Sequence, residues 1–329
     1  MRPADEGTLP VNSSSDQGVS KRLNVFVPEV AYHHVFEGLP AEVHLVTEPQ
    51  PDVAFAVLGM QHLPQLPSYM QALPQLRAVQ SLHSGVDWLL PTLPAGVELY
   101  NASGVHDAAV SEWVVAALLA MRRRLIALLE LQRRGEWDIN LNDVTATGVS
   151  PIGPIDTFEG GTVLILGYGS IGHAVAARLA PFGIRVIGFG RTPRPDTEPM
   201  ETLHEHLAEA DAVVLLLPLT SATEGIVDAD FLARMKPGSI LVNAARGRLV
   251  DTAALVEELH RRRILAALDV TEPEPLPQGH PLWQAPNLLI TPHVAGAVAS
   301  WRLRAYRFAS EQVGRYATMT ALLNHVSSR

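Results

Sequence analysis

Residues 162–179, TVLILGYGSIGHAVAARL, hold an apolar run, a glycine-rich turn and a stretch with helical spacing. Gly167, Gly169 and Gly172 form the pattern G-x-G-x-x-G between the run and the helical stretch. A strand before this pattern and a helix after it are the context in which it binds a dinucleotide pyrophosphate. Gly167 would allow the tight turn, Gly169 the approach of a pyrophosphate, and Gly172 close packing of helix on strand. The alternative is an ordinary glycine-rich turn, which the flanking context disfavours.

The segment around this turn continues the same alternation. We expect strands at 162–166, 184–189, 212–217, 239–244, 264–270 and 287–291, with helices at 170–182, 203–210, 228–235 and 252–262. Six strands with helical crossovers are what two mononucleotide-binding halves need. The helix N-terminus after the turn would face the cofactor phosphates. These features predict an α/β fold with a Rossmann dinucleotide-binding domain over residues 107–297.

The chain before residue 107 also alternates apolar runs with loops. We expect strands at 23–27, 42–46, 52–58, 76–82 and 97–101, in a second parallel sheet. Residues 107–135 have helical apolar spacing and predict one or two buried helices, whereas 138–158 lack periodicity and predict a long loop. Residues 297–323 are again helical in pattern. We expect them to return to the first sheet, so that residues 21–106 and 298–329 form one domain.

Residues 188–195, GFGRTPRP, follow the second strand of the nucleotide-binding segment. An acidic side chain at this place usually holds the adenosine ribose of NAD(H). Here the strand ends in Gly190, which would remove the repulsion of a 2′-phosphate, and Arg191, Thr192 and Arg194 could bind that phosphate. We therefore predict a preference for NADP(H). The alternative is that the arginines lie in a solvated loop and that NAD(H) is used.

Polar residues follow three late strands of the same segment. Arg246 comes after the fourth strand, Asp269 ends the fifth with Glu272 and Glu274 nearby, and His293 follows the sixth. Ligands of open α/β sheets bind at the carboxyl ends of the strands, so these side chains could converge there. Arginine can hold a carboxylate, histidine can transfer a proton, and a carboxylate raises the pKa of a neighbouring histidine. The pattern predicts a hydride-transfer site, although each residue alone could be structural.

The composition limits the partners of the chain. Of 329 residues, 47% are hydrophobic and 18% charged, which allows a large core, and the net charge is −9. An acidic chain argues against nucleic acid and anionic membranes as partners. The absence of cysteine excludes disulfides and thiolate metal sites, and no apolar run is long enough to span a membrane. We expect a cytoplasmic protein with no metal, in which residues 1–20 form a flexible tail.

Eight stretches in this order resemble the D-isomer-specific 2-hydroxyacid dehydrogenase family. They are SGVDWL (84–89), AVSEWVVAALLA (109–120), VLILGYGSIG (163–172), LPLTSATEGIV (217–227), MKPGSILVNAARGRLVD (235–251), AALDVTEPEPLP (266–277), HPLW (280–283) and NLLITPHVAG (287–296). The resemblance implies a flavodoxin-like substrate domain beside the Rossmann domain. It also implies a homodimer.

The resemblance assigns roles to individual residues. Arg246 would bind the substrate, His293 would be the acid and base, and Glu274 would be the catalytic glutamate. Backbone amides around Ser84 and Gly85 would hold the substrate carboxylate. The positions implied for the cofactor, together with the loop after the second strand, are Gly167, Gly169, Ser170, Ile171, Gly172, Arg191, Thr192, Arg194, Pro218, Ala244 and Asp269.

The sequence departs from the family pattern at several places. Gly190 replaces a common acid, Thr271 stands where an aromatic residue is usual, and His83 and His106 near the substrate loops are unusual. These departures bear on the substrate rather than on the reaction. We predict reduction of a small 2-oxo acid to a D-2-hydroxy acid, as in the NADP-preferring glyoxylate/hydroxypyruvate reductase branch. A phosphoglycerate, formate or phosphite dehydrogenase, or a non-catalytic dinucleotide-sensing protein, stays an alternative.

Overall fold

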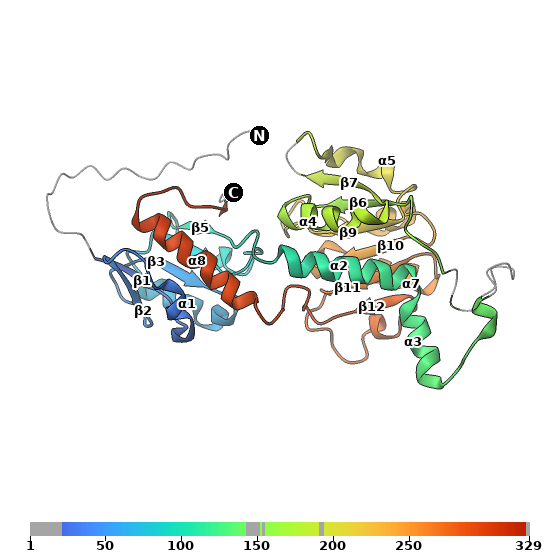
Figure 1. The fold of residues 1–329 in the computed structure, drawn as a ribbon, viewed down its shortest axis with the longest axis horizontal. Coiled ribbons are helices and arrows are strands. Elements are labelled where there is room, and N and C mark those ends of the chain that lie inside the picture. The colour runs from blue at the N-terminus through green and yellow to red at the C-terminus, as the bar shows by residue number, and fades with distance from the viewer. Residues whose placement is uncertain (1–21, 143–151, 153–154, 191–193, 327–329) are drawn as a thin grey trace. The chain divides into compact units, whose positions relative to one another are not determined.

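The computed structural model describes residues 22–142, 152, 155–190 and 194–326, and the chain divides into two compact units. Unit 1 consists of Met1–His106 and Ala299–Arg329, and unit 2 of Asp107–Val298 (Figure 1). The expected tail at 1–20, most of the expected loop at 138–158, and Arg191 and Thr192 lie outside the described residues. Among the helices of the described part, none is long and apolar enough to cross a membrane.

Unit 1 contains a six-stranded sheet in the order β13-β5-β4-β3-β1-β2. The parallel strands are β1 (Leu23–Phe26), β2 (Val43–Val46), β3 (Val53–Leu58), β4 (Ala78–Ser81) and β5 (Glu98–Tyr100). The order 2-1-3-4-5 of these five strands is flavodoxin-like. A short strand, β13 (His325–Val326), pairs antiparallel with β5 and is not evident from the sequence. Helices α1 (Leu66–Ala72) and α8 (Trp301–Ala317) complete the unit.

A partly buried polar network joins three segments of unit 1. The Glu29 carboxylate, three residues beyond β1, accepts hydrogen bonds from Tyr306 of α8 and from Gln61, and lies 2.6 Å from His62 Nε2. The Nδ1 atom of His62 accepts a hydrogen bond from the N–H of Gly59, which directly follows β3. The other ring nitrogen, Nε2, therefore carries a hydrogen and donates a hydrogen bond to Glu29. These hydrogen bonds lower the pKa of Glu29 from 4.5 to about 2, although burial opposes them as the largest single influence. The network fixes the loop after β3 to β1 and α8.

Unit 2 contains a seven-stranded parallel sheet in the order β12-β11-β10-β9-β6-β7-β8. Its strands are β6 (Thr162–Leu166), β7 (Arg185–Gly190), β8 (Glu198–Pro199), β9 (Ala212–Leu215), β10 (Ile240–Asn243), β11 (Leu265–Leu268) and β12 (Leu288–Ile290). In chain order this is 3-2-1-4-5-6, the Rossmann arrangement, with a seventh strand added. All six expected strands of this segment are present, and β8 is an additional short one. The predicted α/β class with a Rossmann and a flavodoxin-like unit is confirmed.

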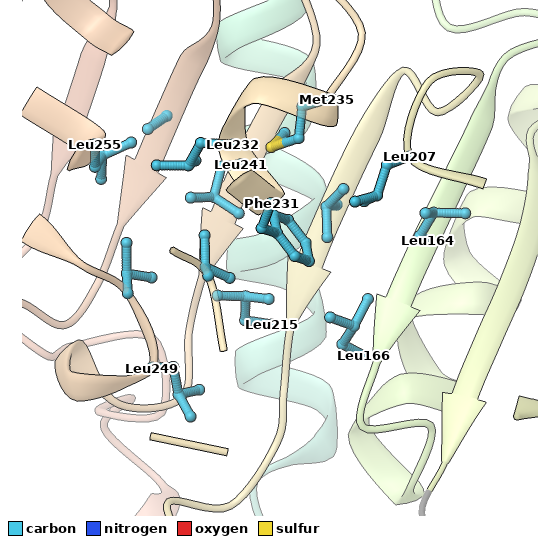
Figure 2. Close-up of a cluster of buried hydrophobic side chains, with 14 of the residues drawn as sticks. Leu164, Leu166, Leu207, Leu215, Phe231, Leu232, Met235, Leu241, Leu249 and Leu255 are labelled. Atoms are coloured by element: carbon cyan, nitrogen blue, oxygen red, sulfur yellow. The ribbon is translucent and has the colours of Figure 1, made fainter. Parts of the chain in front are cut away.

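The core of unit 2 lies on both faces of the sheet because successive side chains of a strand point to opposite faces. Leu164 and Leu166 of β6 belong to one buried cluster with Phe231 of α6 (Ala229–Arg234) and, at its far side, Leu255 of α7 (Thr252–His260), as Figure 2 shows. Val163 and Ile165 face α2 (Asp107–Arg122) and α4 (Ser170–Leu179) instead. Each fully buried Leu, Ile or Phe side chain contributes roughly 1.5–3 kcal/mol to folding.

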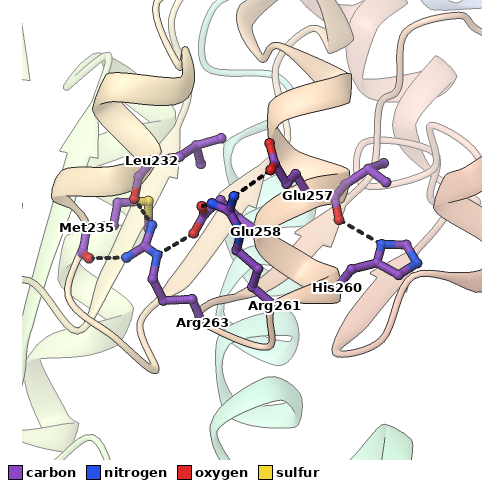
Figure 3. Close-up of polar contacts among 8 residues, drawn as sticks. Leu232, Met235, Glu257, Glu258, His260, Arg261 and Arg263 are labelled. Atoms are coloured by element: carbon purple, nitrogen blue, oxygen red, sulfur yellow. Dashed lines mark hydrogen bonds and ion pairs between the residues drawn. The ribbon is translucent and has the colours of Figure 1, made fainter.

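The amino-terminal edge of the sheet is closed by polar contacts. Arg263 donates to the carbonyls of Leu232 and Met235, where α6 ends, and pairs with Glu258 of α7 (Figure 3). Arg261 adds a pair with Glu258 at 2.9 Å. Lysine, arginine and histidine near helix ends satisfy the last carbonyls of a helix. This edge therefore holds α6 against α7, at the end of the strands opposite the glycine turn.

The predicted helical region at 107–135 is two helices. The break falls at Arg124, which has a left-handed backbone (φ 55°), and α3 (Leu125–Arg134) follows it and ends at Gly135. Within its described residues α3 buries no side chain, and Figure 1 shows it standing off the body of unit 2. The expectation of buried helices is correct for α2 and wrong for α3. Leu125 and Leu129 are exposed in the single chain and Leu128 and Leu131 only partly buried, although their spacing is that of a buried helix.

Candidate active site

The glycine turn between β6 and α4 has the shape that a pyrophosphate site requires. Gly167 has φ +96°, and a Cβ there would lie 2.5 Å from the Leu216 carbonyl group. Gly169 is the N-cap residue of α4, with no side-chain cap, and a Cβ on it would meet nothing within 4 Å. At Gly172 a Cβ would lie 3.0 Å from the Gly167 oxygen. The open space before an uncapped helix N-terminus fits a dinucleotide phosphate.

The adenosine end of this site contains an acid that the sequence analysis did not single out. Asp196 Oδ1 lies 3.2 Å from Arg194 Nε, and Asp196 Oδ2 lies 2.8 Å from His173 Nε2. Arg194 also donates to the carbonyl of Tyr168, inside the glycine turn. The predicted absence of an acid holds at Gly190, where β7 ends, but a carboxylate stands six residues further on.

A histidine–carboxylate pair lies beyond the ends of β11 and β12. The Nδ1 atom of His293 is 2.6 Å from Glu274 Oε1. Both side chains are about two-fifths exposed, so they are accessible from outside unit 2. Arg246, three residues after β10, is close enough to both for its charge to lower the pKa of each. The structure thus brings together the three residues that the sequence proposed for catalysis.

The electrostatics of this pair favour a protonated histidine. The hydrogen bond that His293 donates to Glu274 raises the pKa of His293 above 6.5, against the opposing influence of burial. The same hydrogen bond lowers the pKa of Glu274 below 4.5, again against burial. Because Nδ1 donates a hydrogen bond to Glu274, Nε2 is the nitrogen that can transfer a proton to a ligand. The pair is therefore a proton donor with its second nitrogen held in a fixed direction.

Asp269 holds the backbone turn that carries His293. Its buried carboxylate accepts hydrogen bonds from the Thr291 hydroxyl at 2.6 Å and from the N–H groups of Val294 and Ala295 at 2.8 Å each. The N–H of His293 bonds to the Asp269 carbonyl at 2.7 Å, and His293 has a left-handed backbone with φ 55°. The carboxylate thus fixes the turn that carries the histidine, a role the sequence analysis did not find. A contact with nicotinamide stays a prediction.

Gly247 allows the Arg246 and Glu274 segments to meet. A Cβ at Gly247 would overlap the carbonyl group of Thr271, so only glycine lets these two stretches touch. Thr271 is itself buried, and its hydroxyl donates to the Pro273 carbonyl at 2.8 Å. A residue in this buried position shapes the loop rather than the exposed site.

Comparisons with known proteins agree with this geometry. A family model described as "D-isomer specific 2-hydroxyacid dehydrogenase, NAD binding domain" matches residues 115–295. The chain belongs to the D-isomer specific 2-hydroxyacid dehydrogenases. A glyoxylate/hydroxypyruvate reductase B of Serratia proteamaculans is 34% identical over 281 residues, which cover 82% of this chain and 83% of the relative.

Two solved structures of 2-hydroxyacid dehydrogenases share the fold of both units. One, from Xanthobacter autotrophicus in complex with NADPH and MES, is 30% identical with a TM-score of 0.75, covering 93% of this chain and 98% of the other. An NADPH-dependent glyoxylate/hydroxypyruvate reductase from Sinorhizobium meliloti, in complex with NADP and sulfate, is 28% identical with a TM-score of 0.76 and the same coverage. The predicted family is confirmed, and these neighbours support the predicted use of NADP(H), with NAD(H) possible.

Two further positions that the 2-hydroxyacid dehydrogenase resemblance assigned to the cofactor lie at strand ends near the glycine turn. Pro218 follows β9 and is exposed, and its carbonyl accepts the Thr223 hydroxyl at 2.7 Å. Ala244 directly follows β10 and is half-buried. Both strands end at the same edge of the sheet as β6, so these positions are compatible with the predicted roles.

In unit 1 of this dehydrogenase the predicted substrate loop follows β4. The hydroxyl of Ser84 donates to Ala102, and the Gly85 carbonyl accepts the Trp88 indole N–H, each at 3.0 Å. Among the residues that the structure describes, neither the Ser84 nor the Gly85 N–H has an acceptor. Two adjacent amides with this freedom suit a carboxylate ligand.

The unusual histidines of unit 1 pack against aromatic rings. His83 and His106 are stacked with centroids 6.0 Å apart, and Trp301 of α8 lies 5.2 Å from His83 and 5.7 Å from His106. This packing gives both histidines aromatic neighbours within unit 1.

Proposed function

We propose that this 2-hydroxyacid dehydrogenase reduces a small 2-oxo acid to a D-2-hydroxy acid, with NADPH as the favoured hydride donor. The observation that carries the proposal is the 2.6 Å pair of His293 and Glu274 at the edge of a Rossmann sheet, with Arg246 beside it. A charged arginine and a protonated histidine are what a 2-oxo acid needs, because it presents a carboxylate and a carbonyl oxygen.

Each side chain has a separate task in this reaction. Arg246 binds the substrate carboxylate and polarises the carbonyl. The Nε2–H of His293 gives its proton to the carbonyl oxygen, and Glu274 stabilises the protonated ring before that transfer. The nicotinamide ring, when bound, supplies the hydride that the carbonyl carbon accepts. In the reverse direction His293 takes the hydroxyl proton. The amides of Ser84 and Gly85 would add a second contact to the substrate carboxylate.

The relatives favour glyoxylate and hydroxypyruvate as substrates over the phosphoglycerate, formate and phosphite alternatives. The test is initial rates at 340 nm with NADPH and NADH, on glyoxylate, hydroxypyruvate, pyruvate and phenylpyruvate. We expect turnover of the first two. Arg246→Gln and His293→Gln should each lose at least 100-fold in kcat/KM. Tight dinucleotide binding without turnover of any 2-oxo acid would reject the proposal in favour of a sensing role.

We also infer a homodimer, with α3 and the residues after it as the contact. Leu125, Ile126 and Leu129 are each about two-fifths exposed, and Trp137 and Ile139 are 86% and 65% exposed. Large exposed apolar side chains this close together in the sequence favour an interface, and a twofold contact between copies buries the same residues of each copy. Light scattering after gel filtration should give about twice 35.6 kDa.

The control for the dimer is an exposed apolar residue on another surface. Leu129→Glu should give the mass of one chain, whereas Met319→Glu, on the 70% exposed Met319 of unit 1, should leave the dimer intact. A monomeric unaltered protein would contradict the inference. A cytoplasmic location stays a prediction.

A further inference from the structure

His173 holds two acceptors at once. Its Nδ1 atom lies 2.6 Å from the Gly169 carbonyl oxygen, and its Nε2 atom lies 2.8 Å from Asp196 Oδ2. A carbonyl and an ionised carboxylate only accept hydrogen bonds, so each contact favours a ring N–H that points at the oxygen. His173 lies in the first turn of α4, and Asp196 brings a negative charge beside this end of the helix, where the helix dipole favours an anion.

Asp196 also engages the arginine of the adenosine end. Its second oxygen lies 3.2 Å from Arg194 Nε, while Arg194 Nη2 donates to the Tyr168 carbonyl in the glycine turn. The hydrogen bond from His173 lowers the pKa of Asp196, so its carboxylate is charged at neutral pH. The three side chains are 42–48% exposed, which leaves them open to a ligand.

We propose that Asp196 is a cofactor-specificity residue that restrains the preference for NADP(H). It binds the side chains of Arg194 and His173, and the 2′-phosphate of NADP(H) must compete with it for these two partners. A cofactor with a free 2′-hydroxyl meets no such competition. This inference rests on the proposed use of NADP(H) and assigns a residue that limits it.

The charges decide the direction of the effect. Arg194 and Asp196 together carry no net charge, and a phosphate monoester brings about −1.5 to −2 at pH 7. Two like charges a few ångströms apart repel even near water, so Asp196 weakens phosphate binding although it orders the arginine. Removing its charge without changing its shape frees Arg194 and His173 for the phosphate.

The test uses ligands that isolate this site from catalysis. Calorimetric titration of the full chain with adenosine 2′,5′-bisphosphate and with 5′-AMP measures the contribution of the 2′-phosphate alone, and NADP⁺ and NAD⁺ repeat the comparison with whole cofactors. For Asp196→Asn we expect about three- to tenfold tighter binding of the bisphosphate and of NADP⁺. Binding of 5′-AMP and NAD⁺ should change less than about twofold.

Two variants serve as controls. Glu198→Gln removes the same charge two residues along, from an exposed carboxylate that is not a partner of Arg194 or His173, and should leave both ligand pairs unchanged. Arg194→Gln in the Asp196→Asn background should abolish the gain, because the gain depends on the released arginine.

Three outcomes would overturn the inference. Weaker binding of the bisphosphate to Asp196→Asn would mean that Asp196 positions Arg194 for the phosphate. Equal tightening of 5′-AMP, or an equal effect of Glu198→Gln, would mean a general charge effect. Because these measurements need no turnover, they stand apart from the proposed function. An inactive chain that binds the bisphosphate as expected would contradict only the proposed reaction.

Discussion

At the scale of single residues, the pair of His293 and Glu274 sets the pH range of the reaction. Glu274 raises the pKa of His293, so the histidine stays protonated to a higher pH than a free imidazole would. Reduction needs the protonated form. Its rate therefore falls as the pH rises through the raised pKa of His293, while oxidation of the hydroxy acid needs the neutral form and rises over the same range.

Removing the charge of Glu274 tests this dependence on pH. Glu274→Gln should lower kcat of reduction about 10- to 100-fold, and the alkaline limb of the pH–rate profile should move to lower pH because the pKa of His293 falls. Glu272→Gln is the matched control, on an exposed glutamate two residues away, and should keep the profile of the unaltered enzyme. An unmoved alkaline limb in Glu274→Gln would show that another group titrates there.

Asp269 gives a prediction on stability at the same scale. Its carboxylate accepts three hydrogen bonds while almost fully buried. In Asp269→Asn one amide nitrogen would face the N–H donors of the turn, so we expect unit 2 to lose about 2–4 kcal/mol. Urea unfolding followed by hydrogen exchange measures this for each unit. A loss below about 0.5 kcal/mol would contradict the supporting role of Asp269.

Some residues of the site could be predicted from the sequence, and Asp196 could not. Arg246, Glu274 and His293 follow three strands, and the topology of a parallel sheet brings strand ends together, so a convergent site could be predicted. Asp196 lies six residues after the end of β7, and two prolines precede it in the sequence, at 193 and 195. Its side chain contacts His173, which is 23 residues earlier in the chain, and no local sequence pattern predicts a contact over that separation.

At the scale of elements, glycines of unit 2 serve different ends. Gly247 lies against the Thr271 carbonyl, where a methyl group cannot fit, whereas the space that a Cβ on Gly169 would occupy is open. We predict that Gly247→Ala destabilises unit 2 by about 2–4 kcal/mol and separates Arg246 from Glu274. Gly169→Ala should keep the stability within about 1 kcal/mol but weaken NADP⁺ binding at least tenfold, because its methyl group occupies the phosphate space.

Thermal unfolding and calorimetric titration separate these two effects. A stable Gly247→Ala protein would contradict the tight contact. A Gly169→Ala protein that binds NADP⁺ normally would place the pyrophosphate elsewhere.

Secondary structure was predictable where apolar residues form distinct runs. All strands of the two sheets except β8 and β13 could be placed, because apolar residues recur in blocks of four to seven between polar loops. The division between α2 and α3 could not, because the break falls on Arg124, and arginine rarely adopts a left-handed backbone. β8 and β13 have two residues each, which is too short for any periodicity.

At the scale of the whole molecule, unit 1 has a source of acid sensitivity of its own. Ionised Glu29 stabilises unit 1, since its pKa is about 2 in the folded unit against an ordinary 4.5. A lowered carboxyl pKa gives stability that is present above the ordinary value and is lost as the pH falls from about 4.5 toward 2. We therefore expect the stability of unit 1 to fall steeply in this window.

The corresponding variant is Glu29→Gln. It should lower the stability of unit 1 at pH 7 by about 1–3 kcal/mol and flatten its dependence on pH below 4.5. Hydrogen exchange across a urea series reads β1 and β3 for unit 1, with β6 as an internal control for unit 2. Equal losses in both units would contradict a local role of the network.

His293 has a backbone conformation that glycine adopts without strain. His293→Gly would therefore remove the ring while the turn, held by Asp269, keeps its shape, leaving an imidazole-sized space beside Glu274. Free imidazole added to this inactive variant should occupy the space and restore part of the reduction rate, saturably and with a pH dependence that follows the imidazole chosen. An added imidazole would then serve as the acid of this enzyme. Rates with a series of substituted imidazoles of different pKa would measure how far proton transfer has advanced in the transition state.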